Sequence, residues 1–209
     1  MSSSGYQVPT HKTAHPFMFE EIIKGSRFIA RIAFTPSVDQ AKSFVKHFNV
    51  TEPEATHHCW AYVVGNPSST TLIACSDDGE PSGTAGMPML NVLKHAAIGD
   101  ITAVVTRYYG GTKLGTGGLA RAYGGSVKQA LEQLETSQRI FTEKFEIHCA
   151  YDLQKQIEYL INEVQGEILD IQFTNQVSLQ LEVPRDNITQ LQLSLEAYIN
   201  KQQLQLNKL

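Results

Sequence analysis

The hydrophobic pattern of the C-terminal third predicts alternating strands and helices. Apolar and polar residues alternate in short stretches, as in half-buried strands, and apolar residues recur at helical spacing in two longer ones. Gly166 and Pro184 stand where the first helix is expected to end and the second to begin. The strands are expected at 145–150, 168–173, 177–183 and 204–206, and the helices at 152–164 and 184–199. The order βαββαβ is typical of a ferredoxin-like sandwich.

The rest of the chain has most of its expected strands first and two of its three expected helices late. Residues Ile101–Tyr109 are nearly all apolar or β-branched, as in a central strand buried on both faces. Thr84 and Thr116 are expected to be the N-caps of the two later helices. Strands are expected at 19–24, 27–34, 57–64, 71–75 and 101–109, with a turn near Gly25, and helices at 38–48, 84–97 and 116–134. This order predicts an α+β two-layer sandwich.

Composition changes near residue 137, which we take as a domain boundary. Residues 1–136 carry eleven basic and eleven acidic side chains, whereas residues 137–209 carry six and ten and therefore hold the whole formal charge of −4. The second part also contains twelve of the sixteen glutamines and only one glycine, Gly166. It offers no acid/base pair or metal cluster. We expect two domains, 1–136 and 137–209, the second being a scaffold or docking module.

The 209 residues, 42% hydrophobic and 18% charged, have the composition of a globular protein. The three cysteines, Cys59, Cys75 and Cys149, form no C-x-x-C pair, which argues against a disulfide framework and a thiolate zinc site. The first ten residues lack the apolar core of a signal peptide, and no run approaches the roughly 18 apolar residues that span a bilayer. We expect a cytoplasmic protein without a membrane partner, in which only a local basic patch can hold a nucleic acid.

Eleven of the fifteen glycines lie between Gly79 and Gly125, many of them in the loop after the central strand. The sequence of this loop is Arg107-Tyr108-Tyr109-Gly110-Gly111-Thr112-Lys113-Leu114-Gly115-Thr116-Gly117-Gly118. Strand periodicity places Arg107 and Tyr109 on one face and Tyr108 on the other. At the helix start, the N–H groups of Gly117, Gly118 and Leu119 lack helical partners and, with Lys113, favour a phosphate or carboxylate. Alternatively, the glycines serve only tight turns and the basic side chains are solvated.

The helix after Thr116 has an apolar stripe from Leu119 to Leu134 and a second face with Arg121, Gly125, Lys128 and Glu132. Adjacent Gly124 and Gly125 each cost about 1 kcal/mol relative to alanine, which indicates close approach of either the sheet or a ligand. The helix start matches G-x-G-x-x-A, but no strand with a terminal acidic residue follows and the chain has no P-loop motif. A Rossmann or P-loop enzyme is therefore not expected.

A second candidate is the loop Ser76–Thr84, in which Asp77, Asp78 and Glu80 could hold a cation such as Mg²⁺. Turn formation accounts better for these residues, because Asp and Gly are turn formers and EF-hand spacing is missing. The run His57-His58-Cys59-Trp60 suggests zinc, but a strand places at most two of these ligands on one face. We expect no metal or other cofactor, and no catalytic triad can be assembled.

These motifs resemble the two-domain bacterial form of the IMPACT family over residues 15–209. The resemblance is carried by S-D-D-G-E-P-S-G-T-A-G at 76–86, R-Y-Y-G-G at 107–111, L-G-T-G-G-L at 114–119 and H-H-C-W at 57–60. It implies a fold like the second domain of ribosomal protein S5 over 1–136, followed by a ferredoxin-like domain similar to domain V of elongation factor G. It also implies an RNA, ribosome or translation-factor partner. Eukaryotic relatives restrain a translation kinase with an added RWD domain that this sequence lacks, so that role is not expected here.

The resemblance predicts a non-enzymatic, translation-associated regulatory protein. Binding is expected through Arg107, Tyr108, Tyr109, Gly110, Gly111, Lys113, Gly117, Gly118, Arg121 and Lys128, with Asp77, Asp78, Glu80, His57 and His58 as secondary candidates. The S5-type fold also includes small-molecule kinases, so one alternative is a nucleotide-binding enzyme that uses the helix start after Thr116. Another is protein docking through the acidic, glutamine-rich second domain.

Overall fold

The computed structural model describes residues 5–68 and 72–209. Residues Tyr6–Arg139 and Ile140–Leu209 form two compact units, each of mixed α/β structure. The boundary expected after residue 136 falls inside strand β7 (Thr136–Ile140). Thr71, the expected first residue of one strand, lies outside the described residues. Within the described ranges, every helix is too short or too polar to cross a membrane.

The first unit contains a five-stranded sheet in the order β2-β3-β6-β4-β5, in which all neighbouring strands are antiparallel. Lys24 and Gly25, with φ of 48° and 83°, turn β2 into β3, which confirms the expected hairpin. The central strand β6 is buried along Ile101–Arg107, as its apolar run predicts. The strands are β2 (Phe17–Ile23), β3 (Ser26–Phe34), β4 (His57–Val63), β5 (Ile73–Ser76) and β6 (Ile101–Tyr108).

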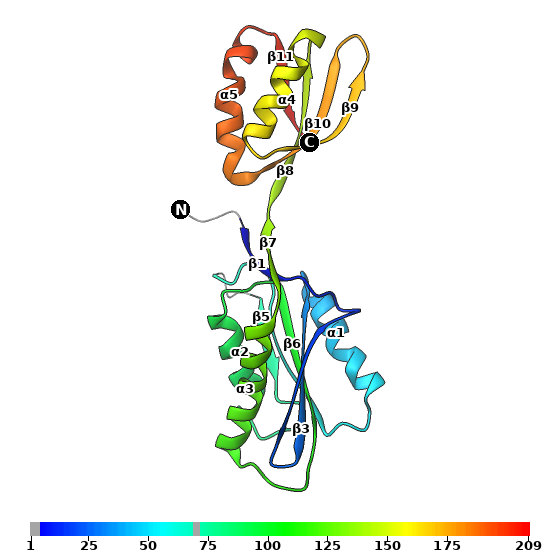
Figure 1. The fold of residues 1–209 in the computed structure, drawn as a ribbon, viewed down its shortest axis with the longest axis vertical. Coiled ribbons are helices and arrows are strands. Elements are labelled where there is room, and N and C mark those ends of the chain that lie inside the picture. The colour runs from blue at the N-terminus through cyan, green and yellow to red at the C-terminus, as the bar shows by residue number, and fades with distance from the viewer. Residues whose placement is uncertain (1–4, 69–71) are drawn as a thin grey trace. The chain divides into compact units, whose positions relative to one another are not determined.

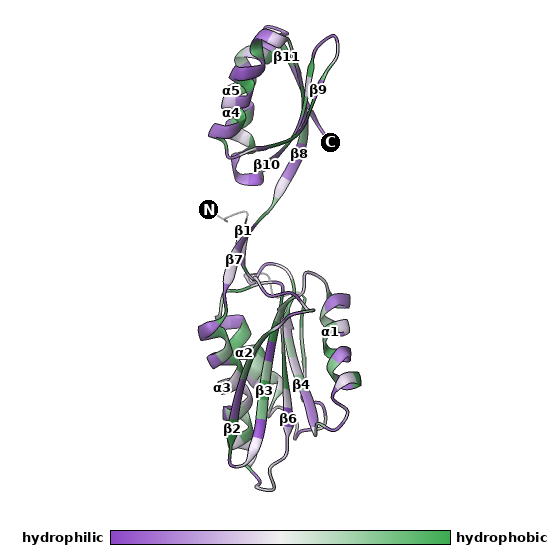
Figure 2. Cartoon of the chain, turned by 45° about the vertical axis from the view of Figure 1, so that its right-hand side comes forward, coloured by the Kyte–Doolittle hydropathy of each residue, from purple (hydrophilic) through white to green (hydrophobic). Residues whose placement is uncertain are grey.

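Helices cover both faces of this sheet (Figure 1). Helix α1 (Val38–Thr51) packs on one face, and α2 (Gly86–His95) and α3 (Thr116–Gln133) pack on the other. Polar and apolar residues alternate along these helices, as Figure 2 shows. The unit therefore has three layers rather than the expected two, because the sheet also carries apolar side chains on the face that α1 covers, among them Ala33, Val104 and Tyr62. The buried residues of α1 are Ala41, Phe44, Val45 and Phe48, which have the i, i+3, i+4, i+7 spacing of an apolar helix face.

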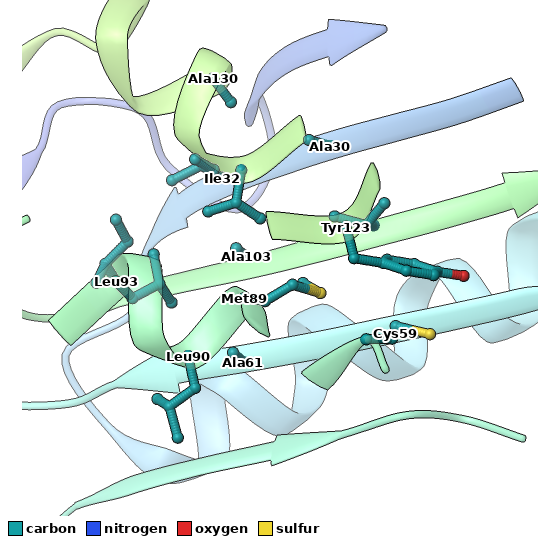
Figure 3. Close-up of a cluster of buried hydrophobic side chains, with 14 of the residues drawn as sticks. Ala30, Ile32, Cys59, Ala61, Met89, Leu90, Leu93, Ala103, Tyr123 and Ala130 are labelled. Atoms are coloured by element: carbon teal, nitrogen blue, oxygen red, sulfur yellow. The ribbon is translucent and has the colours of Figure 1, made fainter. Parts of the chain in front are cut away.

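The larger core lies between the sheet and the helices α2 and α3 (Figure 3). The sheet contributes small side chains here, among them Ala61 and Ala103, and these let the helices approach closely. Larger side chains such as Met89 and Leu93 of α2 fill the space above them. Tyr123 of α3 lies at one end of this cluster, next to Cys59 of β4. The helix that follows the glycine-rich loop is thus anchored through its apolar stripe.

Thr84 and Thr116, the expected N-caps, do not cap their helices. The N-cap residue of α2 is Ala85, which makes no side-chain hydrogen bond to the helix. The N-cap of α3 is Gly115, with φ of 74°, a backbone conformation that favours glycine over threonine. Thr116 is consequently the first residue of α3. Asp77, from a distant loop position, satisfies the N–H groups at the start of α2 instead.

Two strands that the hydrophobic pattern does not predict, β1 (Gly5–Pro9) and β7, pair with each other. The fully buried Asp100 holds them, because it accepts a hydrogen bond from the Tyr6 hydroxyl at 2.6 Å and forms an ion pair with Arg139. Burial and then Asp100 raise the pKa of the Tyr6 phenol. Gln7 Nε2 also donates to Gln138 Oε1 at 2.9 Å. These contacts fasten the β1–β7 ribbon at the end of the first unit.

The second unit has the expected element order βαββαβ, and its sheet is antiparallel in the order β11-β8-β10-β9. Pro184 ends a strand instead of starting the expected helix. The elements are β8 (Thr142–Cys149), α4 (Gln154–Glu163), β9 (Glu167–Phe173), β10 (Val177–Pro184), α5 (Ile188–Asn200) and β11 (Leu204–Lys208). Short 3₁₀ turns, Tyr151–Leu153 and Arg185–Asn187, precede the two helices.

Candidate functional site

Arg107, near the end of β6, is almost fully buried and is paired with other side chains of the protein. Its side chain is 6% exposed; Nη1 donates to Glu80 Oε1 at 2.6 Å and Nη2 donates to Ser26 Oγ at 3.2 Å. The guanidinium carbon also lies 5.5 Å from the ring centre of Phe28 and 5.4 Å from that of Tyr109. The sequence does not indicate this burial, which arises because the central position of β6 brings neighbouring elements over this side chain.

Glu80 is the carboxylate at the centre of this cluster, with a side chain only 4% exposed. Its Oε1 accepts hydrogen bonds from Arg107 and from the hydroxyl of Tyr123, the latter at 2.7 Å. Tyr123 is fully buried, and burial followed by the nearby Cys59 and Glu80 raises the pKa of its phenol. Oε2 accepts no hydrogen bond from the described residues, and His57 Nε2 lies 3.9 Å from it. Oε2 keeps a small contact with solvent, although the Glu80 side chain as a whole is nearly buried.

Asp77 fixes the loop Ser76–Thr84 to the start of α2. Its Oδ1 accepts the N–H groups of Ala85 and Gly86 at 2.9 and 2.8 Å, and its Oδ2 accepts the N–H group of Gly83 at 2.8 Å. Burial acts to raise the pKa of this carboxyl, but the three N–H donors outweigh burial, and the pKa lies below its usual value. The carboxylate thus acts as a helix cap at a distance, which explains why Thr84 is not needed for that role.

Asp78 joins the same loop to β4. Its Oδ2 accepts the His58 N–H at 2.6 Å, and its carbonyl oxygen lies 2.7 Å from His57 Nδ1. Since a carbonyl oxygen only accepts, the bond places a proton on Nδ1 of His57.

Burial raises the pKa of the Cys59 thiol, which donates to the Asp77 carbonyl at 2.9 Å. Across residues 5–68 and 72–209, no three His, Cys, Asp or Glu side chains gather as ligands for one metal ion.

Tyr108 and His58 lie on the opposite face of the sheet from Arg107, as the alternation along β6 and β4 predicts. The Tyr108 hydroxyl donates to Glu52 Oε2 at 2.7 Å, and this hydrogen bond is the largest cause of a raised Tyr108 pKa. The His58 ring contacts Thr106 Oγ1 at 3.0 Å and the Glu52 carbonyl at 3.1 Å. Neither side chain can therefore share a small ligand with Arg107.

The loop between β6 and α3 borders a pocket of about 460 Å³. Tyr109 at its edge is 47% exposed, and Gly110, Gly111 and Lys113 are exposed as well. The pocket is lined by Glu80, Pro81, Arg107, Tyr109, Lys113, Leu114, Gly115, Thr116 and Leu119. Two of the candidate loops, 76–84 and 107–118, thus meet at one hollow.

A close contact between two backbone segments explains why one position of the loop is glycine, but it does not explain every glycine there. A Cβ on Gly110 would lie 1.9 Å from the carbonyl carbon of Gly25, so the β2–β3 turn and this loop pack backbone against backbone (Figure 1). A Cβ on Gly117 would meet nothing within 4 Å. The Leu119 N–H donates to the Gly115 carbonyl at 2.9 Å and is therefore not one of the free donors expected at the helix start.

Arg121 and Lys128 are both exposed on α3, on one face and about 10 Å apart along the helix. Lys128 lies twelve residues beyond Thr116, a distance of about 18 Å along a helix, and borders a different pocket between α2 and α3. A Cβ on Gly124 would lie 3.6 Å from Pro88, an ordinary contact, whereas one on Gly125 would meet nothing within 4 Å. No close approach within this unit accounts for the pair of glycines, and Lys128 stands apart from the pocket.

Comparison with known proteins finds a matching protein-family domain in each of the two units. The Impact N-terminal domain matches residues 24–131, and a domain of unknown function, DUF1949, matches residues 147–195. The chain is 43% identical over 182 residues to IMPACT family member YigZ of Escherichia coli K12, which covers 87% of this chain and 89% of that protein. The chain belongs to the IMPACT family. Another IMPACT family member, YvyE of Bacillus subtilis, is 38% identical over 161 residues, covering 77% and 73% of the two chains.

A solved structure described as the crystal structure of a hypothetical protein is 40% identical to this IMPACT family chain. It has a TM-score of 0.68 and covers 99% of this chain and 98% of its own. The Impact N-terminal match includes every residue that lines the pocket beside the β6–α3 loop. The candidate site therefore lies within the part of the chain that this domain defines.

Sequence reasoning missed Tyr123 and Ser26, which hold the Glu80–Arg107 pair of this IMPACT domain in place. Tyr123 was assignable only to the apolar stripe of its helix, although a buried tyrosine hydroxyl usually needs a polar partner. That need is the signal that could have pointed to a buried acceptor. Nothing in the local sequence marks Ser26, which is 81 residues away from Arg107.

Proposed function

We propose that this IMPACT family protein is a non-enzymatic, translation-associated regulator that binds RNA in the cytoplasm through the loop between β6 and α3. Membership of the IMPACT family supports a translation-related regulatory role at the level of the family. We also infer that the first unit is S5 domain 2-like, that the second is ferredoxin-like, and that the RNA is ribosomal. The element order βαββαβ supports the assignment of the second unit.

One observation carries the proposal of RNA binding. Between Tyr108 and Arg121 the chain holds two cations, Lys113 and Arg121, and no carboxylate, and both side chains are exposed. Exposed Tyr109 stands in the same segment, and a base stacked on such a ring gains about 1–3 kcal/mol. Arg107 takes a supporting part, because its guanidinium lies against the Tyr109 ring instead of reaching solvent. The segment thus combines an aromatic surface with uncompensated positive charge.

No feature of the described residues favours the kinase-like alternative over RNA binding. The helix start after Thr116 offers the N–H groups of Gly117 and Gly118, but these serve an RNA phosphate equally well. Docking through the second unit is likewise supported only by its acidic composition. RNA binding uses both the charge and the aromatic surface, so it accounts for more of the site.

The test is RNA or ribosome binding of the variant Lys113→Ala/Arg121→Ala as a function of salt. Each lost phosphate contact should reduce the slope of log K against log salt by about 0.7, so the double variant should lose about 1.4. The matched control is Lys42→Ala/Lys46→Ala, which removes the same charge from exposed positions on α1, on the other face of the sheet. Equal slopes for wild type and Lys113→Ala/Arg121→Ala would refute the proposal, as would an equal loss in the control.

A further inference from the structure

The pocket beside the β6–α3 loop has the size and lining of a built ligand site. Its volume of about 460 Å³ falls in the range of roughly 300–1,000 Å³ typical of small-molecule sites. Leu114 and Leu119 supply apolar wall, Tyr109 supplies an aromatic edge, and Lys113 supplies a positive charge. Glu80 also lines the pocket, and its side chain is 96% buried.

The two oxygens of Glu80 have different surroundings, and this asymmetry indicates the chemistry of the ligand. Oε1 is saturated by Arg107 and Tyr123. Oε2 accepts no hydrogen bond from the described residues and still reaches solvent-accessible surface. His57 Nε2, at 3.9 Å, is too far away to donate to it. A ligand that fills the pocket would cut this oxygen off from solvent, and a donor group on the ligand would then be needed to satisfy it.

We infer that this pocket takes one amine-bearing base of single-stranded RNA, whose exocyclic –NH₂ donates to Glu80 Oε2; this inference rests on the RNA-binding function proposed above. The base enters against Tyr109 and the leucines, and its phosphate lies toward Lys113 and the N–H groups at the start of α3. Cytosine and uracil make the sharpest comparison. At the same ring position, cytosine carries an amine, which donates hydrogen bonds, and uracil carries a carbonyl oxygen, which accepts them.

The experiment compares binding of oligocytidylate and oligouridylate of equal length. Wild type should bind oligocytidylate about tenfold more tightly, the worth of one hydrogen bond to a charged group. Glu80→Gln should abolish or reverse this preference. Arg107 and Tyr123 are donors and hold the carbonyl of the glutamine, so its –NH₂ must stand at the Oε2 position, where it donates to uracil. Lys113→Ala should weaken both oligomers by the same factor, because a phosphate contact does not read the base.

A second arm leaves the protein unchanged, so that misfolding of Glu80→Gln cannot decide the result. Oligomers of N4,N4-dimethylcytidine lack the amine hydrogens and should bind wild type no better than oligouridylate. If all three oligomers bind wild type equally, the base pocket is refuted while the proposed RNA binding stands. If none binds at low salt, RNA binding itself is refuted and the base pocket with it. The two failures are therefore distinguishable.

Discussion

Replacing Glu80 by alanine should destabilise the first unit strongly, because two buried groups depend on this one carboxylate. The change leaves the Arg107 guanidinium, 94% buried, without its counterion, which costs about 3–5 kcal/mol. It also leaves the buried Tyr123 hydroxyl without an acceptor, at about 1–3 kcal/mol. The pocket admits water that can hydrate the exposed side of the cluster, so we expect a total near the lower end, about 4 kcal/mol. That is a large part of the 5–15 kcal/mol that stabilise a typical protein.

Urea unfolding followed by tryptophan fluorescence measures this effect selectively, since the only tryptophan of the chain, Trp60, lies in β4 of the first unit. The control is Glu80→Ala/Arg107→Met, which removes both charges and leaves an apolar side chain in place of the guanidinium. It should recover about 2 kcal/mol relative to Glu80→Ala, because no unpaired charge stays buried. A loss below about 1 kcal/mol for Glu80→Ala, or a double variant as unstable as the sum of its parts, would contradict the reasoning.

Two further predictions concern the loops around the pocket. Asp77→Asn should lower the free energy of unfolding at neutral pH by about 1–2 kcal/mol. The pKa of the Asp77 carboxyl is lowered on folding, so its contribution to stability is present above the usual pKa near 3.8 and is lost as pH falls through the folded pKa. The urea midpoint should therefore fall less between pH 7 and about pH 3 in Asp77→Asn than in wild type. Parallel curves for the two proteins would count against the role of Asp77 as a helix cap. Gly110→Ala should cost about 3 kcal/mol, because its Cβ would lie 1.9 Å from Gly25, whereas Gly125→Ala, which meets nothing, should gain up to about 1 kcal/mol. Thermal melting of both variants decides this, and equal shifts would show that the backbone contact is not needed.

Local periodicity predicts most of the strands and helices because it depends on residues only a few positions apart. The four inward residues of α1 and the burial of β6 follow from it directly. It fails for β1 and β7, which are held by pairing with each other and by the contacts of Asp100 rather than by an apolar pattern of their own. The third layer of the first unit was also not predicted, because the pattern shows which face of α1 is apolar but not which face of the sheet it covers.

The candidate site shows the same division between local and distant information. The loop, its glycines and the exposed Tyr109 and Lys113 can be found from the sequence. The burial of Arg107 cannot, because its partner Glu80 is 27 positions away and its second hydrogen-bond partner, Ser26, is 81 positions away. Charge alone suggested that Arg107 binds the ligand, whereas its contacts make it a support for Tyr109 and a partner that orients Glu80.

The pairing of β1 with β7 has a consequence for folding during synthesis. β1 is made before the other strands described here, yet Gln7 must wait for Gln138, 131 residues later. At about 5–20 residues per second, this delay is roughly 7–26 s. The sheet between them can form meanwhile, and the entropy of closing so long a loop grows only with the logarithm of its length. The β1–β7 ribbon can therefore form only after the whole first unit has been synthesised. Deleting Gly5–Pro9 would leave β7 as an unpaired edge strand that is prone to association with other chains.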